Sequence, residues 1–449
     1  MAGSEQYGDV WQFLAADPRP IIVYGMGDGA EKLIARLADI GRRPAAVFAS
    51  DDFARGAEFL GFRVGTLDDA LGKTGGDVII AVAFATCLAD VMARIRALSR
   101  RYTLVVPDMP PFGEGLFTEE YAAAHEKELH SARALFADDE SRRVFDALLK
   151  FRLFGDISAL DGTESVPAEA AALLRLPAEP CYIDLGAYDG DTALVFAAEH
   201  PRYRRIWAVE PDRKNFKKLL KNTAGMRDVR AVFAAAGEKD GEAVIAVTGS
   251  RNSSLAAPGT RRAETVPAVS VDTLAAKAQV DLIKLDVEGA EREALLGAKK
   301  TIKRCAPALM AAAYHRVDDI FALPLLIKKL RSDYDIYLRR FPYYPAWDVF
   351  LYCVRRSEAA FVYLLLCADG TLYCGWTNDL HKRLAAHNAA KGAKYTRSRL
   401  PVRLVYAERA ANRNEALSRE REIKALPREK KLALAESFRK ASGADAFML

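Results

Sequence analysis

Residues 181–192 read CYIDLGAYDGDT, and this stretch decides the fold of the middle of the chain. A short apolar run leads into a loop with glycines at 186 and 190, and a helix is expected to start directly after the loop. Gly186 and Gly190 allow a sharp turn and a close approach to a ligand, because neither carries a Cβ. Asp191 or Thr192 is expected to cap the helix. The pattern predicts a ligand-binding turn at the carboxyl end of a parallel strand.

Two acidic residues suit this turn to a ligand that contains an amino group and a ribose. Asp184 precedes the loop, where its carboxylate can accept a hydrogen bond from an amino group. Glu210 ends the next strand, in IWAVEP, where an acid commonly binds two ribose hydroxyls. The loop lacks the GxGxxG spacing that presents amides to a pyrophosphate, which favours a ligand without phosphate. The alternative interpretation is a glycine-rich turn in a sheet that binds nothing.

The remaining sequence predicts an α/β protein of several domains. Apolar runs alternate with helical patterns from about residue 19 to 111 and again from 181 onward, which is typical of parallel sheets flanked by helices. The tail opens with FVYLLLCADGTLYCGW, two strand-like runs around Asp369-Gly370, a strong hairpin signal. The expected domains are a Rossmann-like parallel-sheet domain at 1–118, a helical connector at 119–170, a larger α/β domain at 171–356 and a small α+β domain at 360–449.

Composition and charge favour a cytoplasmic protein with one basic domain. The sequence has no apolar stretch of membrane-spanning length, no signal-like start and no CxxC pair among its six cysteines. From Glu358 onward it has 17 Lys plus Arg against 10 Asp plus Glu, a net of +7, whereas the whole chain is at +5. We therefore expect an anionic partner such as DNA or RNA at the last domain.

The N-terminal domain carries a weaker nucleotide-binding signal. The run IIVYGMGDGA places Gly25 and Gly27 between an expected strand and helix, the context that a dinucleotide fingerprint needs. Both glycines are candidate cofactor contacts. The acids Asp51 and Asp52, however, lie some residues beyond the strand end where a ribose-binding acid is expected. Nucleotide or sugar-nucleotide binding and a structural or dimerising role both stay open, because this fold serves many functions.

The middle of the chain resembles the FkbM methyltransferase family from about Ser141 to Val354. The resemblance rests on these ordered motifs: IDLGAYDGDTALVF, VEP, RNSSL, VDTL, IKLDVEGAEREALLGA and AAYHRVDDIFALPLLIKKL. It implies a class I methyltransferase with a seven-stranded sheet that uses S-adenosylmethionine to methylate a hydroxyl of a sugar, glycan or secondary metabolite. The cofactor contacts that it implies are Asp184, Gly186, Gly190 and Glu210.

The resemblance also points to catalytic candidates. It places Asp286 and Glu288 at the end of the fourth strand and His315 at the end of the fifth. Each is a possible general base toward a hydroxyl, with Asp286 favoured. A structural histidine and a carboxylate at a helix start are the alternatives for His315 and Glu288. The histidine that the family usually has near its last strand is replaced by RRFPYYPAWD, at 339–348.

The tail resembles the GIY-YIG endonuclease superfamily from Phe361 to about Leu434. The segments FVYLLLCADGTLYCGW, GAKYTR and EALSREREIK carry this resemblance. It implies phosphodiester cleavage with one divalent metal, Mg²⁺ or Mn²⁺, held by Glu420. The other catalytic candidates are Tyr363, Tyr373, Arg383 and His387. Tyr363 is the one implied to help deprotonate water, and Arg383 can grip a phosphate through its planar fork.

Two features bear on the activity of this tail. Lys391, Lys394, Arg397 and Arg399 surround an aromatic residue, as on a surface that follows a phosphate backbone, although a solvated basic face is the alternative. The polar residue that some members carry about three turns after the glutamate is missing near Leu432. A domain that only binds nucleic acid is therefore the competing interpretation.

Three hypotheses for the whole chain remain. The first is an O-methyltransferase that its terminal domains assist. The second is a nucleic-acid enzyme whose nuclease domain is primary, which the sequence disfavours because DVEG stands where base methylation on a flipped nucleotide needs an asparagine-proline motif. The third is a fusion of two independent functions across the joint at 355–359.

Overall fold

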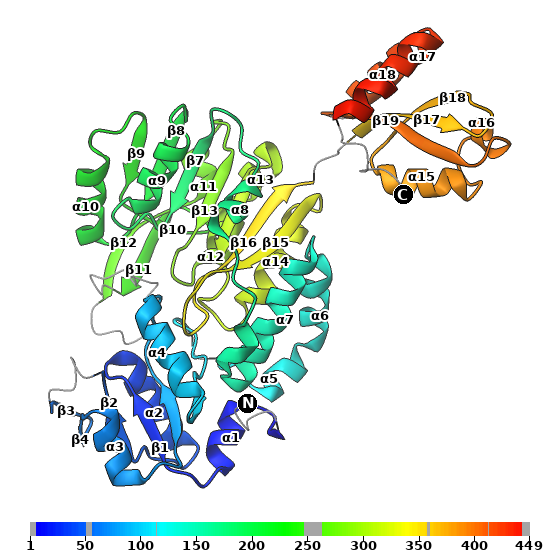
Figure 1. The fold of residues 1–449 in the computed structure, drawn as a ribbon. Helices are drawn as coiled ribbons and strands as arrows, with labels where there is room; N and C mark the ends of the chain where they lie inside the picture. Colours follow the sequence, from blue (N-terminus) through cyan, green and yellow to red (C-terminus); the bar gives the residue numbers. More distant parts are fainter. Residues whose placement is uncertain are drawn as a thin grey trace. The chain divides into compact units, whose positions relative to one another are not determined.

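A computed structural model describes residues 6–50, 56–113, 115–246, 263–356, 360–411 and 413–441 (Figure 1). The chain divides into two compact units, 1–355 and 356–449, and each is described by itself. The stretch RNSSL at 251–255, together with Asp51 and Asp52, lies outside the described residues. Within the described residues, no helix combines the length and the apolar character needed to cross a membrane.

Unit 1 begins with a four-stranded parallel sheet in the order β2-β1-β5-β6. The strand β1 is buried at every position because it is one continuous apolar run, as expected for a strand with helices on both faces. The strands are β1 (Ile21–Tyr24), β2 (Ala46–Phe48), β5 (Ile79–Val82) and β6 (Thr103–Val105), with a small hairpin of β3 (Glu58–Phe59) and β4 (Phe62–Arg63). The helices are α1 (Val10–Ala16), α2 (Asp28–Asp39), α3 (Leu67–Thr74) and α4 (Ala89–Ser99).

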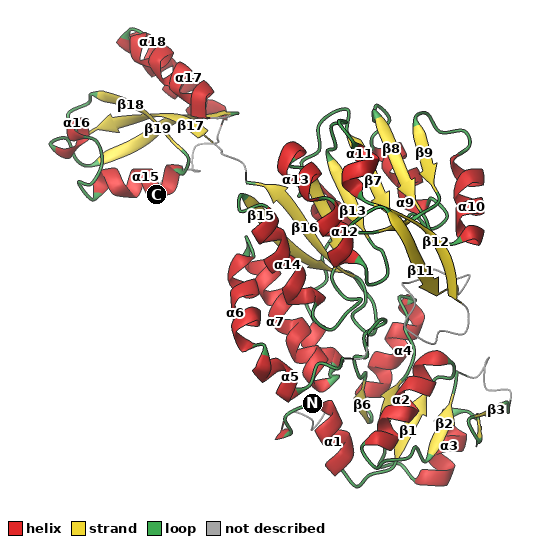
Figure 2. Cartoon of the chain, turned by 180° about the vertical axis from the view of Figure 1, so that it is seen from behind, coloured by secondary structure: helices red, strands yellow, loops and turns green. Residues whose placement is uncertain are grey.

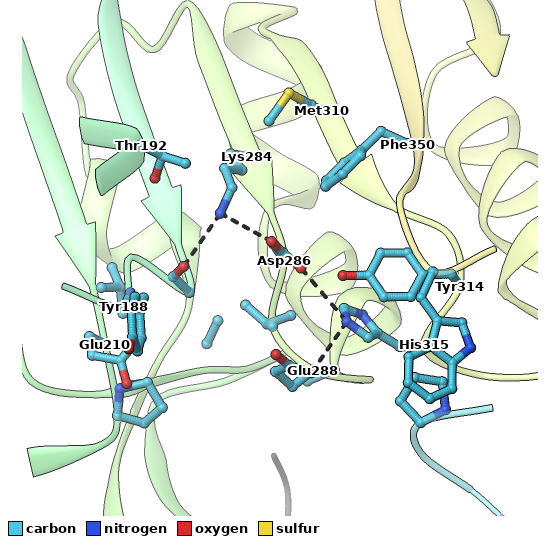
Figure 3. A pocket seen from close by; sticks show the side chains of 18 of the residues that line it. Tyr188, Thr192, Glu210, Lys284, Asp286, Glu288, Met310, Tyr314, His315 and Phe350 are labelled. Carbon is cyan, nitrogen blue, oxygen red and sulfur yellow. Dashed lines mark hydrogen bonds and ion pairs between the residues drawn. The ribbon is translucent and has the colours of Figure 1, made fainter. Parts of the chain in front are cut away.

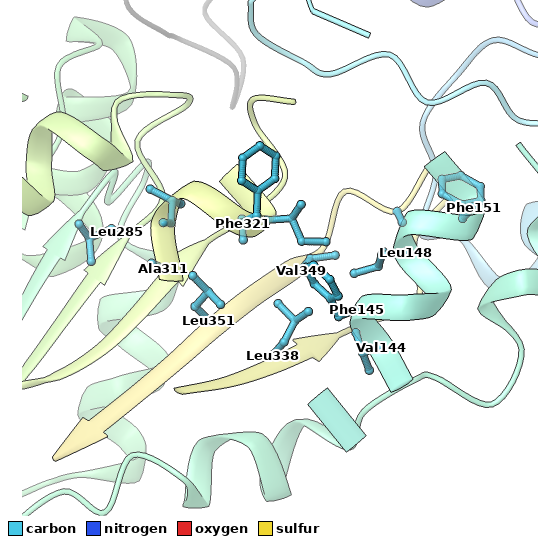
Figure 4. Close-up of a cluster of buried hydrophobic side chains, with 14 of the residues drawn as sticks. Val144, Phe145, Leu148, Phe151, Leu285, Ala311, Phe321, Leu338, Val349 and Leu351 are labelled. Atoms are coloured by element: carbon cyan, nitrogen blue, oxygen red, sulfur yellow. The ribbon is translucent and has the colours of Figure 1, made fainter. Parts of the chain in front are cut away.

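A helical segment joins this sheet to the larger one and packs on it. Its elements are α5 (Glu119–Ala124), α6 (Glu126–Leu135), α7 (Asp139–Phe154), the 3₁₀ helix η2 (Ile157–Leu160) and α8 (Pro167–Ala172). Figure 4 shows Phe145 and Leu148 of α7 directed at Leu338 and Val349 of the large sheet. Arg339 of that sheet is buried and donates to Asp138 at the start of α7. The helical segment is thus part of the same core as the sheet.

The large sheet has seven strands in the order β15-β16-β14-β13-β7-β8-β9 (Figure 2). The strand β16 runs opposite to the other six strands, and it pairs with both β14 and β15. The strands are β7 (Cys181–Leu185), β8 (Arg205–Val209), β9 (Val229–Val232), β13 (Leu282–Leu285), β14 (Ala308–Ala312), β15 (Tyr334–Arg340) and β16 (Val349–Arg355). The helices are α9 (Asp191–Glu199), α10 (Arg213–Thr223), α11 (Val271–Ala275), α12 (Glu291–Gly297), α13 (Lys299–Cys305) and α14 (Asp319–Leu330).

A second, three-stranded sheet follows β9, with β12 in its centre. Its strands are β10 (Ala235–Ala236), β11 (Gly241–Ala246) and β12 (Ala263–Val269). The multidomain α/β architecture expected from the sequence, with two parallel-rich sheets, is confirmed.

In its described residues, unit 2 is a three-stranded antiparallel sheet in the order β18-β17-β19 with four helices. The hairpin predicted around Asp369-Gly370 joins β17 to β18, and the Asp369 carboxylate accepts from the backbone of Thr371. The elements are β17 (Ala360–Cys367), β18 (Leu372–Thr377), β19 (Val402–Ala410), α15 (Leu380–Asn388), α16 (Lys394–Arg397), α17 (Arg413–Ala425) and α18 (Arg428–Ala441). This small α+β domain is the one that the sequence predicted.

Candidate functional sites

A cavity of about 480 Å³ opens at the carboxyl ends of β7, β8, β13 and β14. In an open α/β sheet this edge is where ligands bind. Five of the predicted site residues line the cavity: Gly186, Glu210, Asp286, Glu288 and His315. Asp184 and Gly190 lie beside it but not on its wall.

The turn after β7 is built as the sequence predicted, except at the helix cap. Gly186 has φ +79°, and a Cβ there would overlap the backbone carbonyl of Asp286, so the turn after β7 and the turn after β13 touch. Gly190, rather than Asp191 or Thr192, is the N-cap residue of α9, and no side chain of the described residues caps that helix. The Thr192 hydroxyl instead donates to Asp184 Oδ2 at 2.5 Å.

Asp184 is fully buried and belongs to an ion-pair network beneath the cavity. Lys284, on the neighbouring strand β13, places its Nζ 3.3 Å from Asp184 Oδ1. The same Nζ lies 3.5 Å from Asp286 Oδ2 (Figure 3). Burial alone would lower the pKa of Lys284, but the two carboxylates hold it above its usual value. Burial raises the pKa of Asp184, against the opposing effect of Lys284. Lys284 was not predicted, although a lysine inside the apolar strand LIKL is the signal that could have found it.

Glu210 ends β8 and faces the cavity from a nearly buried position. Its Oε2 accepts from the backbone N–H of Tyr188 at 2.9 Å, and its Oε1 accepts from that of Asp212 at 2.8 Å. Each carboxylate oxygen has two lone pairs, so each keeps capacity for a ligand hydroxyl. Burial raises the pKa of Glu210 to about 7.

His315 is buried among three carboxylates. Its Nδ1 lies 2.9 Å from Glu291 Oε1, and its Nε2 lies 3.3 Å from Glu288 Oε2 and 3.7 Å from Asp286 Oδ1. Burial would lower its pKa, but Glu291 and Glu288 raise it well above the usual histidine value. Burial also raises the pKa of Glu288. The cavity wall therefore holds a positively charged imidazole beside carboxylates.

Two residues on the cavity wall have an unusual backbone conformation. Tyr188 has φ +48° and Glu288 has φ +54°, in the left-handed region that side chains other than glycine rarely adopt. Such residues cost about 1–3 kcal/mol each and cluster at functional sites. Each strained residue lies in a turn that follows a strand of the cavity edge, β7 or β13.

The side of the cavity beyond these acids is aromatic. The rings that line it belong to Tyr314, Tyr343, Trp347 and Phe350. The Nε1 of Trp347 is buried and has no hydrogen-bond partner among the described residues. Burial raises the pKa of Asp348, on the same wall, to about 6. The segment 339–348 supplies part of this wall.

The N-terminal domain also contributes to the cavity. Ala85, which follows β5, and Pro111, which follows β6, lie on its wall. Thr86 and Tyr344 exchange two backbone hydrogen bonds, of 2.7 and 2.9 Å, and so join the N-terminal sheet to the aromatic wall. Phe112 donates its backbone N–H to the carbonyl of His315 at 3.0 Å.

The predicted nucleotide loop of the N-terminal domain has acidic and aromatic surroundings. Gly27 is the N-cap residue of α2, whose first turn contains Asp28 and Glu31, and such acids disfavour a phosphate there. The ring of Phe84 lies where a Cβ on Gly25 would be, at 2.6 Å. The nucleotide contacts predicted at Gly25 and Gly27 stay predictions.

In unit 2 the predicted tyrosine, arginine and histidine form one hydrogen-bonded cluster. Tyr363 Oη lies 3.0 Å from His387 Nε2 and accepts from Arg383 Nε at 3.1 Å. Tyr373 lies on the same face, with its ring centre 6.3 Å from that of Tyr363 and 5.2 Å from that of His387. Burial raises the pKa of Tyr363 to about 12, and burial together with Arg383 lowers the pKa of His387 to about 4.

The glycine that ends the tripeptide Tyr373-Cys374-Gly375 makes room for this cluster. Gly375 pairs with Tyr363 across the β17–β18 ladder. A Cβ on Gly375 would lie 2.6 Å from Tyr363 Oη, closer than such atoms pack. The glycine is therefore required by the position of the tyrosine hydroxyl.

Glu420, the predicted metal ligand, lies on α17 with its side chain mostly buried. Its Oε1 pairs with Lys424 Nζ at 2.9 Å, one helical turn further on. Across the part of the chain that the structure describes, no three His, Cys, Asp or Glu side chains converge as a metal-binding group. The protein thus offers one carboxylate here, which does not by itself make a metal site.

These features define a class I methyltransferase domain joined to a small domain of the GIY-YIG nuclease-like type. The model of the FkbM methyltransferase domain matches residues 184–357, and that of the GIY-YIG catalytic domain matches residues 359–433. The middle of the chain thus matches the FkbM methyltransferase domain, and its end matches the GIY-YIG catalytic domain.

Individual relatives agree with both matches. An FkbM methyltransferase from Methylobacillus flagellatus has the same fold over 78% of this chain and 96% of its own, at a TM-score of 0.58 and 20% identity. A UPF0213 protein from Clostridium perfringens is 57% identical over 77 residues, which cover 17% of this chain and 83% of the relative. A UPF0213 protein from Haloquadratum walsbyi is 54% identical over 80 residues, which cover 18% of this chain and 90% of the relative. The last domain accordingly belongs with the UPF0213 proteins.

Proposed function

We propose that unit 1 transfers a methyl group from S-adenosylmethionine to a hydroxyl of a sugar or glycan. The observation that carries this proposal is the acid-lined cavity at the strand ends, with Glu210 on one side and Asp286 and Glu288 on the other. A sulfonium is a cation, and buried carboxylates favour cations. The residues therefore fit the cofactor, with Glu210 toward its ribose and the turn at Gly186 beside its amino acid part.

The role of Asp184 in this proposal is partly indirect. Its carboxylate lies under the turn and is engaged by Lys284 and Thr192. Its Oδ1 lies 3.3 Å from Lys284 Nζ, but a carboxylate oxygen has two lone pairs, so the second one is available to an amino group. Asp184 and Gly190 therefore hold the turn in place, and Asp184 keeps its proposed cofactor contact.

Asp286 is the proposed general base. Its Oδ1 is buried without a hydrogen-bond partner among the described residues, and its Oδ2 is held by Lys284. When bound, S-adenosylmethionine supplies an electrophilic methyl group. Asp286 orients the acceptor hydroxyl and takes its proton, while His315, held as a cation by Glu291, orients Glu288 and the acceptor. Alignment of this kind supplies much of the rate in transfer reactions.

The wall of the cavity supports a carbohydrate as the acceptor. Aromatic rings at Tyr314, Tyr343 and Trp347 offer flat apolar faces, and Asp348 offers a hydrogen-bond acceptor. The surplus of carboxylates repels phosphate, which disfavours a nucleic acid at this site. We further propose that the N-terminal domain serves here as part of the acceptor wall, through Ala85 and the bonds between Thr86 and Tyr344.

Calorimetry and radiolabel transfer test this proposal on the full chain. S-adenosylmethionine is expected to bind the wild type, and to bind Asp286→Asn measurably but more weakly, because the variant removes one carboxylate from the cavity wall. Label from its methyl group is expected to reach methyl glycosides of hexoses or deoxyhexoses with the wild type only. Failure of the wild type to bind the cofactor rejects the assignment, and labelling of DNA or RNA but of no glycoside rejects the acceptor class.

For unit 2 we propose phosphodiester cleavage of nucleic acid. The supporting observation is the hydrogen-bonded cluster of the buried Tyr363 and His387 with the half-buried Arg383. A basic stretch with Lys391, Lys394 and Arg397 exposed lies next to it. Arg383 binds the scissile phosphate, and Tyr363 accepts the proton of the attacking water. A divalent metal at Glu420 would need the substrate phosphate as a further ligand and would have to compete with Lys424, so no step is assigned to it.

Nicking of supercoiled plasmid and of branched DNA, with Mg²⁺ or Mn²⁺ added, tests this second activity. Arg383→Ala and Glu420→Gln are expected to abolish cleavage. If Glu420→Gln still binds DNA, the loss of cleavage does not come from a loss of binding. If the wild type binds these substrates but cleaves none of them, unit 2 is a nucleic-acid-binding domain.

A further inference from the structure

Thr396 contacts the catalytic cluster of unit 2 from the loop that follows α15. It is fully buried, as is His387, and its Oγ1 lies 2.7 Å from His387 Nδ1. The same hydroxyl donates to the carbonyl of Ala393 at 2.9 Å. A threonine hydroxyl has one proton to donate. Since that proton goes to Ala393, the oxygen of Thr396 must accept the hydrogen bond, and His387 Nδ1 must carry the proton.

The proton on Nδ1 of His387 also determines the hydrogen bond between the other ring nitrogen, Nε2, and Tyr363. A neutral imidazole with its proton on Nδ1 has a bare lone pair on Nε2. The low pKa of His387 keeps the ring neutral. Its Nε2 therefore accepts the hydroxyl proton of Tyr363 across 3.0 Å, and Tyr363 Oη accepts from Arg383 in turn.

The loop is shaped to bring Thr396 to the ring. A Cβ on Gly392 would overlap His387 Nδ1 and Cγ, so only a glycine lets the loop pass this close. The short helix α16 then places Thr396 under Nδ1, while Lys394 and Arg397 of the same helix stay exposed. One segment thus carries both an exposed basic face and a buried contact to the histidine.

We propose that Thr396 is a positioning residue of the nuclease, which fixes the tautomer of His387 and thereby the direction of the Tyr363 hydroxyl. This inference rests on the proposed nuclease function of unit 2. Because the Tyr363 hydroxyl donates its proton to His387, a lone pair of Tyr363 Oη faces the attacking water and can accept a proton from it. This water attacks the phosphate that Arg383 binds.

The proton transfer that follows is balanced. As the water oxygen bonds to phosphorus, its proton passes to Tyr363 Oη, and the proton of Tyr363 passes to His387 Nε2. The phosphorus bond to the leaving oxygen breaks, and that oxygen takes the electron pair. Tyr363 ends neutral, and His387 holds the proton only transiently, as an imidazolium whose Nδ1–H still donates to Thr396, because its low pKa favours the neutral ring.

Nitrogen NMR of histidine-labelled full-length protein tests the tautomer without reference to cleavage. The wild type is expected to show a protonated Nδ1 and a bare Nε2 for His387, which is identified by its loss in His387→Gln. Thr396→Val, which keeps the shape but removes the acceptor, is expected to lose this tautomer. Thr396→Ser, which keeps the hydroxyl, is expected to retain it.

Plasmid nicking then tests the consequence for catalysis. We expect Thr396→Val to lose about 10–100-fold in kcat, by analogy with the loss of a group that orients a metal-bound histidine, and Thr396→Ser to regain most of it. A wild type with its proton on Nε2, or a valine variant with unchanged tautomer and rate, overturns the proposal. A wild type with the expected tautomer that cleaves no DNA rejects the nuclease function instead.

Discussion

Replacing Lys284 by methionine isolates the ion pair under the methyl-transfer cavity. The side chain of Lys284 is 4% exposed and that of Asp184 is fully buried, with 3.3 Å between Nζ and Oδ1. Methionine keeps the length of the side chain but leaves Asp184 as an uncompensated buried charge. Loss of one partner from such a pair costs about 3–5 kcal/mol in the free energy of unfolding.

The pH dependence of this loss has a definite sign. Without Lys284 the pKa of Asp184 rises further in the folded state, which then binds more protons than the unfolded state. Such a group lowers stability progressively as pH rises from its unfolded pKa to its folded pKa. The deficit of Lys284→Met is therefore expected to be small at about pH 4 and to grow toward pH 8.

Urea unfolding followed by tryptophan fluorescence measures the effect in unit 1. The protein has four tryptophans, and a Trp376→Phe background leaves those at 11, 207 and 347, all in unit 1. The double variant Lys284→Met with Asp184→Asn is the matched control and should recover most of the loss. A deficit below about 1 kcal/mol, or a double variant no more stable than the single one, would refute the assigned burial cost.

Three further predictions concern single side chains. Because burial raises the pKa of Glu210 to about 7, the affinity for S-adenosylmethionine should rise as pH increases through that value, and calorimetry should show no such rise for Glu210→Gln. Gly375→Ala should destabilise unit 2 by about 1–3 kcal/mol through overlap with Tyr363, measured by Trp376 fluorescence, and an unchanged urea midpoint would contradict the packing described. Lys424→Met frees Glu420 and should tighten Mn²⁺ binding, measured by electron paramagnetic resonance, whereas equal affinities would show that the ion pair does not compete.

The strand-end turns could be predicted because they leave local signals in the sequence. The apolar run before Gly186 and the acid at Glu210 mark neighbouring strand ends, and the structure brings both to one cavity. The tyrosine, arginine and histidine of the tail were predicted from the resemblance to the GIY-YIG superfamily, and they form one hydrogen-bonded cluster. In these cases the functional side chains lie on, or directly after, strands and helices, whose side-chain directions follow from the regular spacing of residues.

The contacts that could not be predicted depend on tertiary packing. Lys284 acquires its role only because β13 pairs with β7 and brings it to Asp184. Thr396 acquires its role only because the loop at Gly392 folds over a ring. The helix cap expected of Asp191 or Thr192 failed for a related reason, since Thr192 donates to the buried Asp184 instead.

Two backbone hydrogen bonds between Thr86 and Tyr344 anchor the loop around Ala85. Changes of side chain in this loop therefore need not disturb its position. Backbone bonds of this sort do not depend on which side chains flank them. The loop around Ala85 can therefore vary in side-chain size and polarity while its anchor, the cofactor turn and the acids persist. Acceptor range in such enzymes can diversify by substitutions in a domain that holds none of the proposed catalytic groups.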